Sequence, residues 1–345
     1  MGDVAETARE NTMNAEAETI PRPSPLVRNL ILGLPVGLIV TTVIAMFAYF
    51  RDEEQDRARS SRPASRQPVD RTELETHVQM LGGTIGERHA GRPDRMRVAA
   101  NYIESTLGPA NFGYKTERRT VTVDGVEVTN IVLELTGTSS ARWGEIVVVG
   151  AHVDAVAGSA GAAANGSGVA AVMNLAQSFA GSSHERTLRF VFFGNGAMPW
   201  AGTAASGSVV YATDCAKRGE QVVAMVELGQ LGVFPAKDLA APLGGGEIVV
   251  SGDGAGGALA EDMVRWFQES STLSCRKEVA GGGVSDWKAF AGAGFAAVRI
   301  ASGRELAAGE KDGPEAVDYG RLTQAAQAVE GYWRGVVNPG ASGAR

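Results

Sequence analysis

The sequence has little cysteine, little histidine and no excess of positive charge. Only two of its 345 residues are cysteines, Cys215 and Cys275, and their spacing does not fit a metal-binding cluster. They form either two buried thiols or, outside the cytoplasm, one disulfide. None of the four histidines follows His184, so the second half of the chain offers no imidazole. The formal net charge of −7 argues against a nucleic-acid partner.

Three segments of distinct composition precede the folded part. Residues 1–29 are polar and acidic, which predicts a disordered tail. The next 21 residues, from Leu30 to Phe50, carry no charge and have the length of one membrane-spanning helix. Residues 51–70 are charged and rich in serine, proline and arginine, as is typical of a linker. We therefore expect a single-pass membrane protein with a folded domain at residues 71–338 and a flexible tail at 339–345.

Apolar runs alternate with amphipathic segments throughout the folded part. Helices are expected at residues 94–107, 169–179, 204–216, 258–270 and 319–333, and an earlier one should be capped by Thr72. Strands are expected at residues 146–149, 187–194, 222–228, 247–251 and 295–300, with a hairpin around Asp124 and Gly125. This alternation predicts an α/β domain with a mostly parallel central sheet and helices on both faces.

One stretch combines a buried strand, a polar loop and a helix. It runs from residue 147 to 168 and reads VVVGAHVDAVAGSAGAAANGSG. His152 and Asp154 come where the strand should end, and the carboxyl ends of strands are where sites form in open α/β sheets. A site is therefore expected around His152.

This stretch resembles the signature of the co-catalytic zinc aminopeptidases, peptidase family M28 of the zinc-dependent exopeptidase superfamily. That signature reads approximately GAHYDS…GAxDNxSG. It is matched at His152, Asp154, Gly161, Ala162, Asn165, Ser167 and Gly168. The similarity extends from about residue 74 to 331 through segments such as IGERHAG and TNIVLELTG. It implies the zinc-exopeptidase (phosphorylase/hydrolase-like) fold, two zinc ions and removal of N-terminal residues from peptides.

The resemblance also shows which zinc-site positions have changed. One metal-binding histidine matches His152, and the carboxylate that orients it matches Asp154. The position of the general base is Gly196, and the other ligand positions are Ala164, Ala197, Gly229 and Ala308. Alanine and glycine side chains offer no lone pairs to a metal. We therefore expect no bound cofactor here, although the family uses two zinc ions.

Four further residues are expected near the altered site. Glu227 lies two residues before Gly229 on the same strand face, roughly 6–7 Å back along the strand. Trp287 follows Asp286 where the family has a histidine in its SDHxxF motif. Together with Trp200, it would fill the emptied pocket or line a new one.

The leading interpretation is a membrane-anchored, catalytically inactive peptidase-like domain that binds a peptide or protein partner. The alternative is a metallo-aminopeptidase with a non-standard metal site that recruits Glu227 and Asp286. Arginines at 51, 57, 59, 62 and 66 follow the apolar run and favour a cytoplasmic domain. Members of the resembled family are mostly secreted or extracytoplasmic, which favours the outside. We expect the outside.

Two other enzyme classes have weaker support. Residues 252–257 fit the nucleotide-binding pattern G-x-G-x-x-G, and Glu278 follows about twenty residues later. A chain with 45 glycines matches this pattern easily by chance, and the resemblance expects an ordinary turn there. A serine hydrolase would need a G-x-S-x-G nucleophile turn, which the segment NGSG does not provide.

Overall fold

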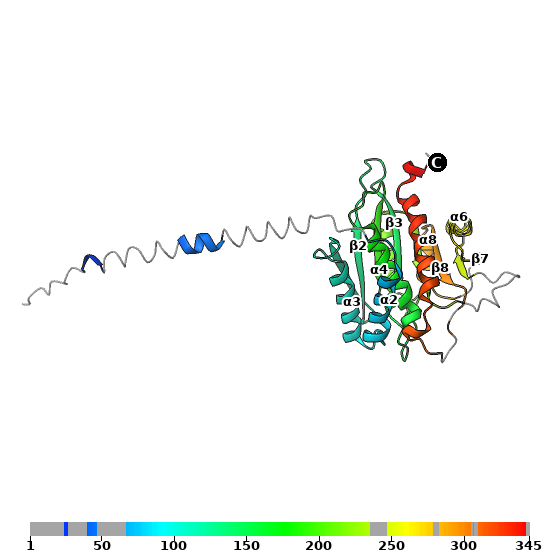
Figure 1. Cartoon of the computed structure of the whole chain (residues 1–345), viewed down its shortest axis with the longest axis horizontal. Helices are drawn as coiled ribbons and strands as arrows, with labels where there is room; N and C mark the ends of the chain where they lie inside the picture. Colours follow the sequence, from blue (N-terminus) through cyan, green and yellow to red (C-terminus); the bar gives the residue numbers. More distant parts are fainter. Residues whose placement is uncertain are drawn as a thin grey trace, which may run out of the picture. The chain divides into compact units, whose positions relative to one another are not determined.

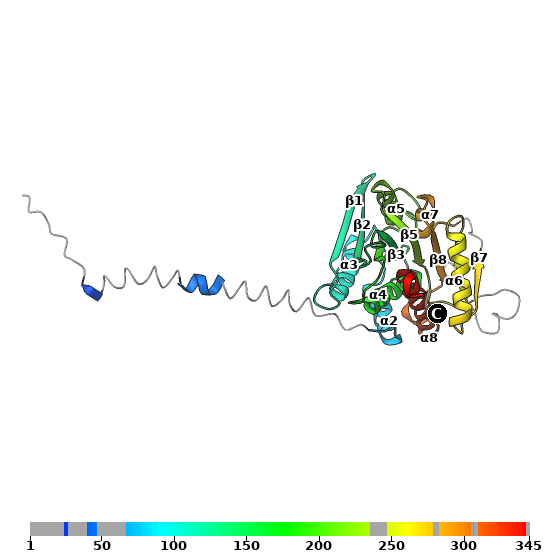
Figure 2. The same cartoon turned by 90° about the horizontal axis from the view of Figure 1, so that it is seen from above.

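The computed structural model describes residues 24–26, 40–46, 67–234, 247–278, 283–304, 306 and 310–342 (Figures 1 and 2). Contacts divide the chain into two units, residues 1–59 and 60–345. In the first unit, residues 40–46 are helical. No helix among the described residues is both long and apolar enough to cross a membrane. The rest of the apolar run at 30–50, and most of the expected tail and linker, lie outside the described residues.

One eight-stranded sheet organises the second unit. Its spatial order is β1-β2-β4-β3-β5-β8-β6-β7. The strands are β1 (Thr116–Val123), β2 (Val126–Leu135), β3 (Glu145–His152), β4 (Thr187–Phe193), β5 (Gln221–Leu228), β6 (Ile248–Ser251), β7 (Cys275–Glu278) and β8 (Ala297–Ser302). The sheet therefore places β3 between β4 and β5, at its centre.

The sheet is mixed rather than mostly parallel. The central pairs β3–β4, β3–β5 and β5–β8 are parallel, as is the outer pair β6–β7. The pairs β1–β2, β2–β4 and β6–β8 are antiparallel. The expectation held for the centre, where strands are joined through helices, and was wrong for the flanks. There a two-residue turn joins β1 to β2, and β6 runs against β8, so chain direction depends on connections that periodicity does not reveal.

Helices cover both faces of this sheet, as the sequence predicts (Figure 2). They are α2 (Arg71–Val78), α3 (Pro93–Leu107), α4 (Gly168–Phe179), α5 (Gly207–Lys217), α6 (Gly256–Ser270), α7 (Asp286–Gly292), α8 (Tyr319–Val337) and α9 (Pro339–Ser342). Shorter helical segments lie at Gln79–Ile85, Ala162–Ser167 and Pro314–Ala316. Buried side chains of α2, α3, α4, α6 and α8 form the larger core, and α5 and α7 form a second core on the other face.

Two local features differ from the sequence-based expectation. The cap of α2 is Asp70, whose carboxylate accepts hydrogen bonds from the backbone N–H groups of Thr72 and Glu73, so Thr72 is not the cap. The short strand β7 and the helix α7 were not predicted. Each has only a few residues, and segments of that length carry little periodic signal.

A buried arginine holds the loop that follows β3. The Arg88 side chain is fully buried. Burial lowers its pKa to about 10, although the negative charges of Asp154 and Asp312 act to raise it. Its guanidinium donates five hydrogen bonds of 2.6–3.1 Å, all to backbone carbonyl oxygens, those of Leu81, Gly86, Val153, Ala160 and Gly161. The loop at residues 153–161 is thus fixed by backbone contacts.

We predict that Arg88→Met lowers the free energy of unfolding by about 3–5 kcal/mol, because it leaves several buried carbonyls without donors. The matched change Arg265→Met, at an exposed arginine 3.7 Å from Asp262, should cost less than about 1 kcal/mol. Urea denaturation measures both. Equal costs for the two variants would contradict the structural role of Arg88.

Candidate functional site

The candidate site is a cavity at the carboxyl ends of the central strands. Its volume is about 790 Å³. His152 lies at the end of β3, and Glu227 and Gly229 lie at and just beyond the end of β5. Ala164, Arg299 and Asp312 also line it. The cavity therefore brings together several positions that the sequence resemblance assigned to the zinc site.

His152 is held by its neighbour Asp154. The Nδ1 atom of His152 is 3.0 Å from the backbone oxygen of Asp154 and 3.4 Å from a carboxylate oxygen. Burial alone would lower the pKa of His152, but the hydrogen bond and charge of Asp154, with the charges of Asp286 and Glu227, raise it to about 9. The carboxylates around His152 therefore favour the protonated form of its imidazole.

Asp154 also binds the loop where the family carries its general base. Its two carboxylate oxygens accept hydrogen bonds from the backbone N–H groups of Gly196 at 2.8 Å and Ala197 at 2.9 Å. A Cβ atom on Gly196 would come within 2.2 Å of the Cβ of His152. A side chain at residue 196 therefore does not fit while His152 and this loop keep their positions.

Asp312 contacts the loop around Ala164. Its carboxylate accepts hydrogen bonds from the N–H groups of Ala163 at 2.5 Å and Ala164 at 3.3 Å, and from the hydroxyl of Ser159 at 3.1 Å. Burial raises the pKa of Asp312, although these hydrogen bonds and the charge of Arg88 oppose the rise. The position of the family's bridging aspartate is thus held from the backbone by a carboxylate distant in sequence.

Glu227 is buried at the base of the cavity with a complete set of partners. It is 3% exposed and accepts hydrogen bonds from the Ser285 hydroxyl at 2.6 and 2.8 Å and from the backbone N–H of Trp287 at 2.9 Å. Arg299, its neighbour on β8, places Nε 3.4 Å from the same carboxylate. A metal ion would compete with the hydroxyl, the N–H group and the guanidinium for the oxygens of this carboxylate.

The guanidinium of Arg299 fills the space next to Gly229. A Cβ atom at residue 229 would lie 2.6 Å from Nε and 3.1 Å from Cζ of Arg299. The position where the family carries an acidic metal ligand is therefore occupied by a cationic side chain from the adjacent strand.

Asp286 lies beside this group, deeply buried at the start of α7. Burial and the nearby charge of Glu227 raise its pKa, while His152 and a hydrogen bond with Ser208 act in the opposite direction. One of its carboxylate oxygens has no hydrogen-bond partner among the described residues. The carboxylates of Asp286 and Glu227 therefore lie close enough to His152 for their charges to raise its pKa.

The remaining predicted residues fall in three places. Trp287 is 1% exposed and packs in the core between the sheet and α5 and α7, so it does not line the cavity. Trp200 is half-buried and lines a different pocket. Ala308 lies outside the described residues. The loop at residues 252–257 lies at the opposite end of the sheet from His152, because β6 runs antiparallel to β8.

The described residues do not fit a pair of zinc ions. None of their His, Cys, Asp and Glu side chains form a group of three or more placed to hold a metal. The sequence did not indicate Arg299 or Asp312 as residues of this site. Arg299 forms an ion pair with Glu227, and Asp312 accepts hydrogen bonds from the backbone of the loop around Ala164. Asp312 lies four residues after Ala308, one of the altered ligand positions, but the loop that it contacts could not be inferred from the sequence.

We predict different costs for adding a methyl group at two glycines of this site. Gly196→Ala should lower the free energy of unfolding by about 1–3 kcal/mol, because the new Cβ meets the rigid start of the His152 side chain. Gly229→Ala should cost less than about 1 kcal/mol, because the flexible end of Arg299 can move.

The exposed Gly144, which has open space around its Cα, is the matched control, and Gly144→Ala should change stability little. Thermal or urea unfolding of the three variants gives the order of their stabilities. A Gly196→Ala protein as stable as Gly144→Ala would show that the loop adapts freely.

The fold of this chain is similar to those of several solved structures. The structure is similar to the LapA aminopeptidase of Legionella pneumophila, with 16% identity and a TM-score of 0.64 over 83% of this chain and 75% of that one. It is also similar to BSAP, a zinc aminopeptidase of Bacillus subtilis (15%, TM-score 0.63, 79% and 96%). A glutaminyl cyclase of Bacteroides thetaiotaomicron matches as well (16%, TM-score 0.59, 77% and 98%).

At such low sequence identity, the structural similarity shows a shared fold but not a shared activity. The sequence itself gives the family, because the model of peptidase family M28 matches residues 130–332. That match covers more than half of the chain and includes His152, Asp154, Glu227 and Arg299. The chain belongs to peptidase family M28.

Proposed function

We propose that this chain is a non-catalytic M28 domain that binds a peptide or protein partner. The observation that carries the proposal is the guanidinium of Arg299 in the space beside Gly229. A hydrolytic zinc site needs histidine or carboxylate ligands, an open position for water and a general base. In this chain the position of the base is Gly196, and its space is taken by His152.

Electrostatics support the same proposal. A divalent cation in this cavity would lie close to the permanently charged guanidinium of Arg299. Glu227 already has a cation and two hydrogen-bond donors, the Ser285 hydroxyl and the backbone N–H of Trp287. Zinc would have to displace these contacts before it could bind Glu227.

The place of the domain in the cell is a separate proposal. The uncharged run from Leu30 to Phe50 supports a single membrane anchor, and family resemblance supports an extracytoplasmic domain. A binding role at a membrane surface is an analogy at the level of the fold, where one scaffold hosts many functions.

A second candidate is a metallo-aminopeptidase with a rearranged site. It is favoured by the convergence of Glu227 and Asp286 on His152, whose charges all interact. In that case Arg299 would move away and the two carboxylates would join His152 as ligands.

Zinc content and hydrolysis separate these functions. We predict that the purified protein, incubated with excess zinc and desalted, retains no stoichiometric zinc by elemental analysis. Its hydrolysis of aminoacyl 4-nitroanilides should equal that of His152→Ala, because no general base or zinc-bound water is present. The matched variant corrects for trace contamination by other peptidases.

One or two zinc ions per chain, lost in both His152→Ala and Glu227→Gln together with hydrolysis, would establish the second candidate. Such a result would overturn the non-catalytic proposal.

A further inference from the structure

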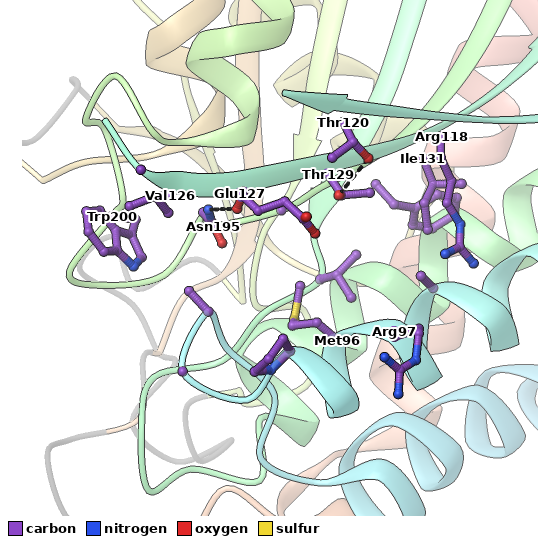
Figure 3. A pocket seen from close by; sticks show the side chains of 18 residues that line it. Met96, Arg97, Arg118, Thr120, Val126, Glu127, Thr129, Ile131, Asn195 and Trp200 are labelled. Atoms are coloured by element: carbon purple, nitrogen blue, oxygen red, sulfur yellow. Dashed lines mark hydrogen bonds between the residues drawn. The ribbon is translucent and has the colours of Figure 1, made fainter. Parts of the chain in front are cut away.

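A second cavity, of about 770 Å³, lies between helix α3 and the β1–β2 hairpin (Figure 3). Met96, Arg97 and Ala100 line it from one side of α3, at the spacing of a single helix face. Thr120 and Glu127 line it from the hairpin. This volume lies within the range of about 300–1,000 Å³ typical of ligand pockets. We call it the hairpin groove.

The hairpin groove is elongated along the strands. Strand register places Arg118 opposite Ile131, Thr120 opposite Thr129, and Thr122 opposite Glu127. From Ile131 to Val126 is five strand steps, or roughly 17 Å, which matches about five residues of an extended peptide. The shape therefore favours a linear ligand.

The two ends of the hairpin groove differ. At one end Arg118 bridges the hairpin to α3, donating hydrogen bonds to Glu104 at 2.7 and 2.5 Å and to Asn101 at 2.6 Å. At the other end, beside the turn at Gly125, stands the half-buried indole of Trp200 (Figure 3). One end is thus closed by an ion pair, and the other offers an aromatic surface.

The hairpin groove has a fixed shape. The side-chain amide of Asn195 donates hydrogen bonds to the backbone oxygen of Glu127 at 3.0 Å and to that of Ala205 at 3.2 Å. The hydroxyls of Thr120 and Thr129 are hydrogen-bonded at 2.9 Å. The hairpin is therefore tied to the loop after β4, and a ligand would meet a preformed surface.

Two opposite charges of the hairpin groove lack partners. In the part of the chain that the structure describes, neither the Glu127 carboxylate nor the Arg97 guanidinium has an ion pair or a side-chain hydrogen bond. Both are exposed, and the carboxylate of Glu127 points into the space above Met96 (Figure 3). A ligand that meets both would carry a cation and an anion along a partly apolar body.

We propose that the hairpin groove binds an extended peptide segment of a partner protein. A basic side chain pairs with Glu127, an apolar or aromatic side chain packs on Trp200, and an acidic side chain pairs with Arg97. The proposal rests on the binding role proposed above and places that role outside the cavity of His152. A purely apolar ligand would desolvate Glu127 and Arg97 without pairing them, and a ligand with charges of one sign would pair with only one of the two and be repelled by the other.

The test uses the full-length chain in detergent and fluorescein-labelled hexapeptides with blocked ends. The peptides carry Lys, Asp, Phe or Ala in different combinations at their six positions, and fluorescence anisotropy gives the affinities. We expect tightest binding for peptides that combine Lys, Phe and Asp. Glu127→Gln should weaken the binding of Lys-containing peptides about two- to fivefold, and Arg97→Gln should weaken the binding of Asp-containing peptides by a similar factor, because ion pairs between exposed groups are screened by water. Trp200→Ala should remove the preference for Phe.

Glu269→Gln is the matched control, because Glu269 is an exposed glutamate on α6, outside the hairpin groove. It should leave every affinity unchanged. All substituted groove residues are at least partly exposed, so unchanged melting temperatures should accompany the altered affinities. This separates loss of recognition from loss of fold.

Three outcomes would overturn the proposal. The first is that no peptide binds. The second is binding that survives the three groove variants but is lost in His152→Ala, which would place the peptide in the other cavity and leave the binding role intact. The third is that a second set of the same peptides, with the N-terminus left free, binds while the blocked set does not, which would replace the basic side chain by a terminal amine. Zinc retention with hydrolysis would instead overturn the proposed function and leave the hairpin groove untouched.

Discussion

A carboxylate buried in a protein must be neutralised and hydrogen-bonded, and Glu227 at the end of β5 satisfies this requirement without a metal. Arg299 supplies the positive charge from the neighbouring strand, and Ser285 and the backbone of Trp287 supply the hydrogen bonds. In a zinc enzyme the metals and carboxylates neutralise one another. Here Arg299 neutralises Glu227, so the domain remains stable although Gly229 and Ala164 provide no metal ligand.

The loops around the cavity depend on the same principle. Arg88 binds backbone carbonyls after β3, while Asp154 and Asp312 bind backbone N–H groups of the loops at residues 196–197 and 163–164. Each contact joins a charged group to the backbone rather than to a metal ligand. The cavity therefore keeps its shape although Ala164, Gly196 and Gly229 carry no side chain that could bind zinc. Retained shape with altered chemistry is the physical basis of the proposed binding role.

Sequence periodicity predicted the longer helices, the central strands and the hairpin, because each has a continuous apolar face, but it did not predict the short α7 and β7. It could not give the mixed direction of the sheet, which depends on how distant segments pair. Within the site, His152, Asp154, Ala164, Gly196 and Gly229 could be located through a motif, but not their new neighbours. Arg299 reaches Glu227 only because β5 and β8 are adjacent in space. The membrane anchor at 30–50 stays a prediction.

The most direct measurement of the central claim is diffraction at the zinc absorption edge from crystals grown with excess zinc. We expect Arg299 in contact with Glu227 and no anomalous peak in the cavity lined by His152 and Gly229. A strong anomalous peak bound by His152, Glu227 or Asp286, with Arg299 displaced, would show that this chain has rebuilt a metal site and would contradict the account.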